Sequence, residues 1–135
     1  MQVMLGMGCD RGTSLNTLEA AVTLAINELA TKELGISIEQ VQGLATIDKK
    51  SDEVGLLELA KKHQWPMHFF NAEQLSEIEV PSPSEVVKKY MGTPSVSEAA
   101  AILAAKTDMK DLVLEKYKFR GDDNKNATVS IVRLA

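Results

Sequence analysis

An alternation of short apolar segments with helical segments constrains the fold of this chain more than any other feature. Residues 3–5, 41–47 and 67–70 are apolar runs typical of buried strands. Between them, over residues 14–33 and 54–63, apolar residues recur at the spacing of an amphipathic helix. Strands that alternate with helices are typical of sheets in which helical crossovers join parallel strands. The sequence therefore predicts an α/β fold.

The last part of the chain predicts a β-hairpin. In residues 111–119, an apolar run at 112–114 is followed by charged and aromatic side chains in alternation, while residues 127–134 alternate apolar and polar ones. The segment between them, residues 120–126, is polar and has no apolar anchor. Two strands joined by such a turn pair antiparallel, so we expect a mixed sheet.

Three signals for the start of a helix lie between these two parts. In each, a capping residue is followed three positions later by Glu or Gln, as in a capping box. The pairs are Asn71 with Gln74, Ser82 with Glu85, and Ser95 with Glu98. We expect three short helices that start near Ala72, Pro83 and Val96, each with a side-chain cap.

The composition indicates one globular domain over residues 1–135. A hydrophobic content of 44% supports a packed core, and a net charge of −4 with 4% aromatic residues weighs against a nucleic-acid partner. The single cysteine excludes an internal disulfide and indicates a reducing compartment. No segment approaches the roughly 18 to 20 apolar residues of a membrane span, and no leader peptide is evident. We therefore expect a cytoplasmic protein without membrane contact.

The segment after the first apolar run has residues that favour an anion. Residues 6–12 contain three glycines, which predict a loop, and Thr13 or Ser14 can cap the helix that follows. A helix N-terminus behind such a loop favours negative charge, and Arg11 adds a forked cation. The glycine spacing matches neither the dinucleotide-binding pattern nor a P-loop. The alternative is a tight turn whose glycines serve only backbone geometry.

Further candidates follow the second apolar run and precede the last helix. Thr46 and Asp48 fall at the carboxyl end of the second predicted strand, the edge where open α/β sheets bind ligands. Asp48 could act as a general base or position a water, unless this segment is only a solvated loop. Residues 92–95, with Thr93 and Ser95, form a second helix entry that can offer N–H groups to an anion.

Cys9 is either a nucleophile activated at a helix N-terminus or a small, half-buried side chain. His63 and His68 form no recognisable pair with it, and these three residues lack the spacing of a metal site. We therefore expect no metal and no cofactor.

The predicted hairpin carries local positive charge despite the acidic balance of the chain. Its basic residues are Lys116, Lys118, Arg120 and Lys125. They indicate either a small polyanionic ligand or the protection of an edge strand by lysines.

Five segments, taken in order, resemble one known family. They are GMGCDRGTS at residues 6–14, LATIDKKSDEVGLLELA at 44–60, FFNAEQL at 69–75, EVPSPSEVV at 79–87 and GTPSVSEAAAILAA at 92–105. Together with LEKYK at 114–118 and NATV at 126–129, they are similar to the cobalamin-biosynthesis family formed by CobE and the C-terminal domain of CbiG. The resemblance covers nearly the whole chain and departs from the family in the longer polar turn at residues 120–125.

The resemblance implies a three-layer α/β/α fold with a mixed, mostly parallel sheet that ends in the hairpin. It also implies the corrin pathway, whose intermediates carry many acetate and propionate groups. Full-length CbiG resembles a hydrolase that opens the ring A lactone of cobalt-precorrin-5A and releases acetaldehyde. This chain corresponds to the C-terminal part of CbiG alone.

We therefore expect a protein of corrin-ring biosynthesis that binds a polycarboxylate corrinoid or precorrin intermediate. The expected substrate-binding residues are Gly8, Cys9, Arg11, Gly12, Thr13, Thr46, Thr93 and Ser95. Arg11 would pair with a substrate carboxylate, and Asp48 would orient a water if the chain supports lactone opening. The alternatives are a hydrolase that acts alone and a non-catalytic module that docks on a separate CbiG N-terminal protein or on other cobalamin-biosynthesis proteins.

Overall fold

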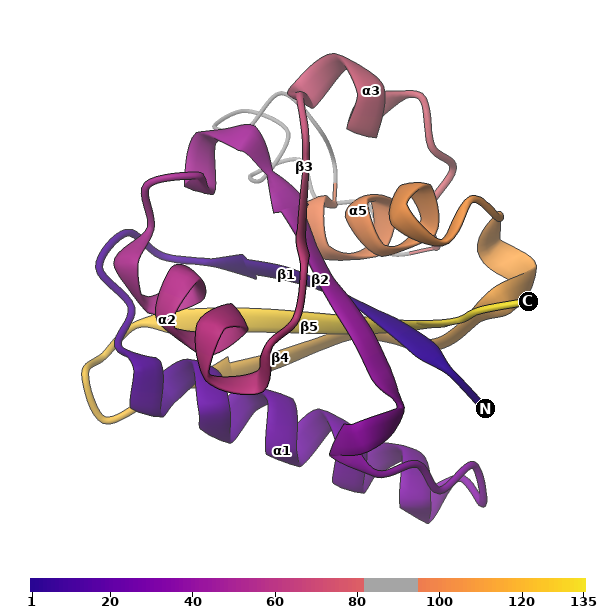
Figure 1. The fold of residues 1–135 in the computed structure, drawn as a ribbon, viewed down its shortest axis with the longest axis horizontal. Helices are drawn as coiled ribbons and strands as arrows, with labels where there is room; N and C mark the ends of the chain where they lie inside the picture. The colour runs from indigo at the N-terminus through magenta and orange to yellow at the C-terminus, as the bar shows by residue number, and fades with distance from the viewer. Residues whose placement is uncertain (82–94) are drawn as a thin grey trace.

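A five-stranded sheet with helices on both faces forms the frame of the protein in a computed structural model that describes residues 1–81 and 95–135 (Figure 1). The strands are β1 (Val3–Cys9), β2 (Val41–Ile47), β3 (Met67–Phe70), β4 (Leu112–Arg120) and β5 (Asn126–Arg133). The α-helices of the described ranges are α1 (Leu15–Thr31), α2 (Val54–His63), α3 (Ala72–Ser76) and α5 (Val96–Ala105). Short 3-10 helices are η1 (Ile38–Gln40), η2 (Asp48–Lys50) and η3 (Met109–Asp111). The helix expected near Pro83 lies outside the described residues.

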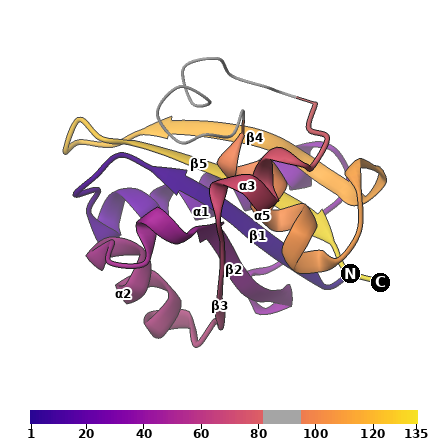
Figure 2. The ribbon, with the colours of Figure 1, turned by 90° about the horizontal axis from the view of Figure 1, so that it is seen from above.

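The strand order is β3-β2-β1-β5-β4. β1 pairs parallel with β2 and β2 pairs parallel with β3, whereas β5 is antiparallel to both β1 and β4. Because β4 is antiparallel to β5, it points in the same direction as β1, and β5 alone is reversed within this sheet. The mixed, mostly parallel sheet with a terminal hairpin is therefore confirmed, and Figure 2 shows β4 and β5 side by side.

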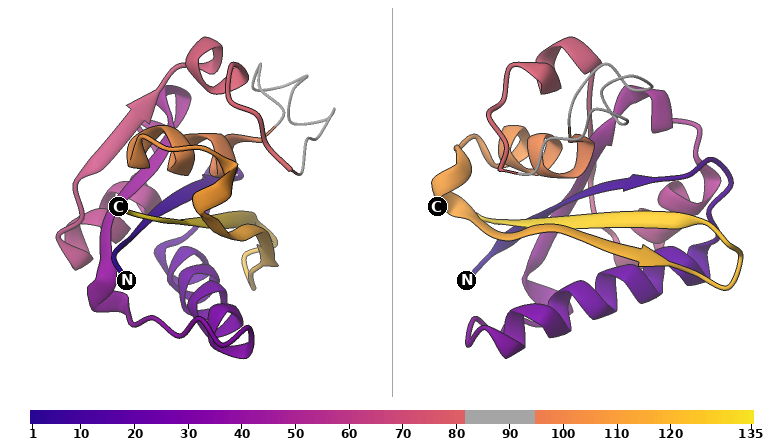
Figure 3. Two further views of the ribbon diagram at one scale, coloured as in Figure 1. Left: turned by 90° about the vertical axis from the view of Figure 1, so that its right-hand side faces the viewer. Right: turned by 180° about the vertical axis from the view of Figure 1, so that it is seen from behind.

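Helices cover the sheet in two outer layers, so the expected α/β/α arrangement is also confirmed (Figure 3). One core lies between the sheet and α1 and α2, and it contains Val3, Leu5 and Met7 of β1. The other core lies between the sheet and α3 and α5, and it contains Ala45 and Ile47 of β2. Both faces of the central strands are buried, which explains why β1 and β2 are nearly continuous apolar runs.

The expectation that the first strand breaks at its glycines is wrong, because β1 continues to Cys9. β5 pairs with every residue of β1, so Gly6 and Gly8 lie inside the sheet rather than in a loop. A Cβ at Gly6 would lie 1.9 Å from the Ser97 carbonyl oxygen and 2.8 Å from the Ala101 Cβ. Glycine is therefore needed at this position because the backbone of α5 rests directly on β1.

The helix starts follow their capping signals at two of the described positions and depart from them at α5. Ser14 accepts a hydrogen bond from the Thr17 N–H and starts α1, and Asn71 forms a complete capping box at α3. Ser95 precedes α5 but its side chain makes no capping bond. The cap expected at Ser95 is therefore absent, although the helix begins at Val96 as expected.

We expect Gly6→Ala to destabilise the protein by about 2–3 kcal/mol, because the methyl group would push α5 away from β1. Urea unfolding followed by circular dichroism would measure this change. Gly35→Ala is the matched control, since nothing lies within 4 Å of a Cβ at Gly35. Equal stability of the two variants would contradict the close approach of α5.

Candidate functional site

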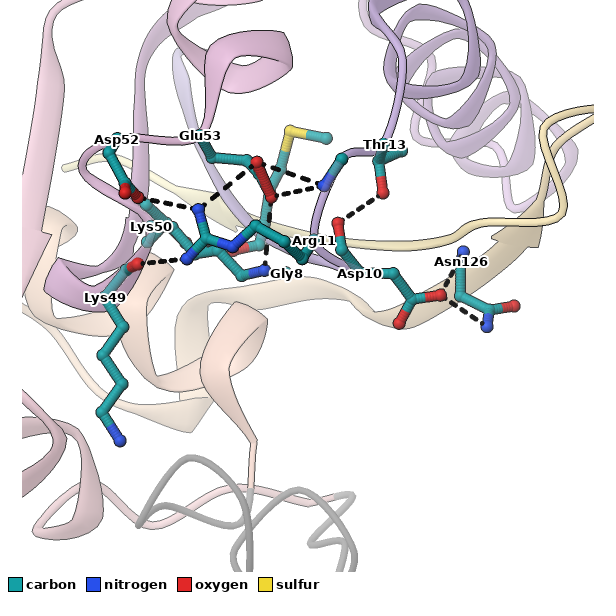
Figure 4. Close-up of polar contacts among 12 residues, drawn as sticks. Gly8, Asp10, Arg11, Thr13, Lys49, Lys50, Asp52, Glu53 and Asn126 are labelled. Carbon is teal, nitrogen blue, oxygen red and sulfur yellow. Dashed lines mark hydrogen bonds and ion pairs between the residues drawn. The ribbon is translucent and has the colours of Figure 1, made fainter.

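The segments that follow β1 and β2 are tied together at the carboxyl ends of these strands (Figure 4). Arg11 Nη1 donates to Asp52 Oδ1 at 2.7 Å, and Nη2 donates to the Lys49 carbonyl at 3.0 Å. The guanidinium holds the pKa of the Asp52 carboxyl below its ordinary value. Both side chains remain largely exposed, at 59% for Arg11 and 78% for Asp52. Arg11 therefore lies at the expected edge of the sheet, but its guanidinium is already paired with the exposed carboxylate of Asp52.

A second carboxylate, that of Glu53, is buried against the loop after β1. The Gly12 N–H donates to Glu53 Oε1 at 3.0 Å and to Oε2 at 3.3 Å, and Arg11 Nη1 lies 3.5 Å from Oε2. Lys50 Nζ lies 3.6 Å from Oε1, and Lys50 and Glu53 are each 3% exposed. Gly12 adopts a φ of 81°, which favours glycine and turns its N–H toward the carboxylate. The N–H group expected to face a substrate anion is thus bonded to a side chain of the protein.

The N-terminus of α1 also holds a carboxylate of the chain, Asp123 from the turn between β4 and β5. The Ser14 N–H donates to Asp123 Oδ2 at 3.0 Å, and Thr17 Oγ1 donates to Oδ1 at 2.8 Å. The bond from the Ser14 N–H is the main cause that lowers the pKa of Asp123 to about 2. The polar turn of the hairpin is therefore fastened to the first helix, although no apolar residue anchors it.

Thr13 and Thr46 both use their hydroxyl groups within the protein. Thr13 Oγ1 donates to the Asp10 carbonyl at 2.6 Å, and Thr46 Oγ1 donates to the Met7 carbonyl at 2.7 Å. Both residues are buried. The Thr13 bond holds the loop after β1, and the Thr46 bond joins the ends of β1 and β2.

Cys9 is the last residue of β1 and is half-buried. Burial raises the pKa of its thiol, and the nearby Lys50 only partly opposes this effect. A raised pKa disfavours the thiolate, which is the nucleophilic form. Of the two roles considered for Cys9, its surroundings favour a packed side chain.

Asp48 lies exposed at the start of η2, one residue beyond β2. Its backbone carbonyl accepts a hydrogen bond from the Ser51 N–H at 3.0 Å. Asp48 therefore occupies the predicted edge of the sheet and presents its carboxylate to solvent.

Of the second helix entry, the structure describes Ser95, directly before α5, and α5 covers the face of the sheet opposite to α1 and α2. Ser95 is buried just before α5, and Thr93 lies outside the described residues. A Cβ at Gly8 would lie 3.8 Å from the Val96 Cβ and 2.9 Å from Thr128 Oγ1. The start of α5 therefore packs beside the carboxyl end of β1, with Gly8 between the two.

The sequence analysis missed the internal contacts that four polar residues make. They are Lys50, Glu53, Glu98 and Asp123. Lys50 and Glu53 belong to a charged segment that reads as a solvated loop, and Glu98 reads as a helix cap. The sequence signal for them is charge that directly flanks buried segments, but their partners come from distant parts of the chain.

The described part of the chain contains no group of three or more His, Cys, Asp or Glu residues that could hold a metal ion. Across residues 1–81 and 95–135, no helix is long and apolar enough to cross a membrane.

The chain has an open α/β/α fold in which the segments after β1 and β2 are joined at the carboxyl edge of the sheet, the edge at which proteins of this class commonly bind ligands. Within this class, the chain belongs to the cobalamin synthesis G C-terminus family, whose model matches residues 3–132. This membership places the chain in cobalamin biosynthesis and confirms the resemblance seen in the sequence.

Several relatives support this assignment. The chain is 38% identical to the cobalt-precorrin-5A hydrolase of Priestia megaterium over 127 residues, which are 94% of this chain and 31% of that protein. It is 32% identical to a probable cobalt-precorrin-5A hydrolase of Methanocaldococcus jannaschii over 90% of this chain and 39% of that protein. The crystal structure of CobE, a protein from the cobalamin biosynthetic pathway, aligns with a TM-score of 0.81 and 34% identity over 99% of this chain and 91% of CobE. The chain thus spans 31% and 39% of the lengths of these two hydrolases.

We expect Glu53→Gln to cost about 3 kcal/mol or more, because it leaves the buried Lys50 ammonium without its anion. Asp52→Asn is the matched control, and its loss should stay below about 1 kcal/mol because the Arg11–Asp52 pair is exposed. Urea unfolding at neutral pH would measure both changes. Equal losses in the two variants would contradict the distinction between a buried and an exposed carboxylate.

We expect Asp123 to contribute stability at neutral pH that is lost as the pH falls. Its pKa is 3.8 ordinarily and about 2 in the folded protein, so the unfolded chain takes up the proton first on acidification. The difference in unfolding free energy between wild type and Asp123→Asn should be constant above about pH 5 and shrink toward pH 2. Denaturant unfolding at a series of pH values would measure it. The exposed neighbour Asp122, changed to Asn, is the control, and a difference that grows toward pH 2 would contradict the assignment.

Proposed function

We propose that this chain binds a polycarboxylate corrinoid intermediate of cobalamin biosynthesis at the carboxyl edge of β1 and β2. The observation that carries the proposal is the exposed guanidinium of Arg11, held in place by a loop that a buried carboxylate fixes. Arg11 Nη1 contacts Asp52 at 2.7 Å while the Arg11 side chain stays 59% exposed. A guanidinium fixed at a ligand-binding edge is suited to the acetate or propionate groups of such a ligand.

The contrast between the two carboxylates explains how Arg11 can serve a ligand although it is already paired. An exposed ion pair contributes only about 0–1 kcal/mol, so a ligand carboxylate can replace Asp52 at little cost. Glu53, which is 3% exposed, stays bonded to Gly12 and near Lys50 during the exchange. In this proposal Asp52 pairs with Arg11 until a ligand carboxylate replaces it, and Glu53 keeps the loop in its binding conformation.

The other residues expected from the sequence remain in the proposed site as its frame, because Gly12, Thr13 and Thr46 make their hydrogen bonds within the protein. Gly8, Cys9, Gly12, Thr13 and Thr46 shape the ends of the strands, and Thr93 and Ser95 belong to the second helix entry. Asp48 would orient a water if the bound ligand is a lactone that this chain helps to open. The expected cytoplasmic location is part of the same proposal.

We expect Arg11→Ala to weaken binding of cobalt-precorrin-5A at least about tenfold, the loss of one charge-assisted contact. Absorption changes during titration of the corrinoid with protein would measure the affinity. Arg133→Ala is the matched control, because Arg133 is 53% exposed and pairs with Asp111 at 3.0 Å. Asp52→Asn should bind at least as tightly as wild type, since it removes a competing carboxylate. Unchanged affinity in Arg11→Ala, or no binding by wild type, would refute the proposal.

A second candidate function is a non-catalytic module that docks on a separate protein carrying the rest of a CbiG-type hydrolase. The observation behind this candidate is that the chain aligns with 31% of the Priestia megaterium hydrolase and with 91% of CobE. Co-purification with the N-terminal part of such a hydrolase, without corrinoid binding by this chain alone, would favour this function.

A further inference from the structure

The last residues of β4 bring basic side chains to the carboxyl edge of β1. In the register of the sheet, Lys118 lies opposite Thr128 of β5, and Thr128 lies opposite Gly8 of β1. Arg120 lies opposite Asn126, one step further toward this edge. The end of the hairpin and the end of β1 therefore meet at one edge of the sheet, although they are far apart in the sequence.

The aromatic and the basic residues at the end of β4 lie on opposite faces of the sheet. Tyr117 and Phe119 pack against the core that contains α1 and α2. Because side chains alternate between the two faces of a strand, Lys118 and Arg120 project from the other face, the one that α5 covers. Both basic residues are exposed. The alternation seen in the sequence therefore produces an apolar inner face and a cationic outer face.

Asn126 connects the end of β4 with the loop that carries Arg11. Arg120 Nη1 donates to Asn126 Oδ1 at 3.4 Å. The Asn126 N–H and Nδ2 both donate to Asp10 Oδ2, at 2.8 and 3.0 Å. Asp10 directly precedes Arg11, and Figure 4 shows it between Arg11 and Asn126. Arg11 and Arg120 therefore lie on either side of the contact between Asp10 and Asn126.

The basic residues of β4 repel one another. Burial lowers the pKa of Lys116, the nearby Glu98 opposes this effect, and the charge of Lys118 lowers the pKa further. Within residues 1–81 and 95–135, no ion pair involves Lys116, Lys118 or Arg120. A bound anion would relieve the repulsion between neighbouring cations. The end of β4 is therefore suited to a negatively charged group from outside the chain.

Protection of an edge strand explains this charge less well than a ligand does. β4 is the last strand of the sheet, and its register shifts between Leu112 and Leu114 and again between Leu114 and Tyr117. Such irregularities already hinder pairing with another edge. The exposed cations follow this irregular part and lie within residues 118–120, at the edge where the proposed ligand binds. Their position favours a contact with that ligand.

We propose that Lys118 and Arg120 bind a second carboxylate of the corrinoid whose first carboxylate binds Arg11. This inference rests on the proposed corrinoid function and extends its site across β5 to β4. Neighbouring strands lie about 4.8 Å apart, so β4 runs about 10 Å from β1, a separation that a macrocycle with several acetate and propionate groups can span. Charge-assisted contacts at two separate points favour a ligand with several carboxylates over a ligand with one.

The test is a titration of cobalt-precorrin-5A with variant proteins, followed by absorption. We expect the double variant Lys118→Ala/Arg120→Ala to bind at least about tenfold more weakly than wild type, and the charge-conserving Lys118→Arg/Arg120→Lys to bind within about threefold of it. Lys61→Ala/Arg133→Ala is the matched control, because it removes the same charge from exposed positions elsewhere. Added sodium chloride should weaken binding by wild type more steeply than binding by the alanine variant, since fewer charges then remain to be screened.

The outcomes separate this inference from the binding proposal. Affinity of the alanine variant within twofold of wild type, while Arg11→Ala binds more weakly, overturns the inference and leaves the binding proposal intact. Unchanged affinity together with self-association of the alanine variant in light scattering overturns it as well, because the basic residues then protect the edge. Equal weakening in the charge-conserving variant also overturns it, because the loss then does not come from charge. Wild type that does not bind refutes the proposed function itself.

Discussion

The capture of the Glu53 carboxylate by the loop after β1 organises the carboxyl edge of the sheet. The Gly12 N–H, Arg11 and Lys50 surround this carboxylate, at distances between 3.0 and 3.6 Å. Two nearly buried opposite charges are expensive to separate, so the segments after β1 and β2 hold one relative position. That position fixes the base of Arg11 while its guanidinium remains exposed. The proposed binding role of Arg11 depends on this arrangement.

The same edge is completed from the other face of the sheet by the close approach of α5. Gly6 permits the helix backbone to rest on β1, and Ala101 presents only a methyl group there. This contact brings Val96, at the start of α5, beside Gly8 near the carboxyl end of β1. A larger residue at Gly6 would therefore alter both the stability of the protein and the position of the start of α5. The close packing of α5 on β1 at Gly6 therefore affects both the core and the carboxyl edge of the sheet.

Internal carboxylates occupy the anion-binding features of the first loop and the first helix. Glu53 bonds to the loop and Asp123 bonds to the start of α1. These bonds are local electrostatic attachments that join distant segments, and they use the same N–H groups that could bind a ligand. A glycine loop before a helix thus indicates affinity for negative charge, but it does not show whether the anion is a ligand or a side chain of the protein. At Arg11 the exposed partner Asp52 leaves room for exchange, whereas at Gly12 the partner is buried.

The sequence by itself determined the elements and their order, because hydrophobic periodicity and capping residues act locally. β2, α2 and β3 begin and end where the pattern placed them, and the hairpin follows from its polar turn. The resemblance to the cobalamin family likewise came from ordered local motifs. Tertiary structure alone decided that β1 continues through Gly6, since β5 and α5 supply the contacts that hold a glycine strand in the sheet. It also decided the partners of Glu53, Asp123 and Glu98, because each contacts a segment far away in the chain. Patterns within a few residues do not show which distant segments meet.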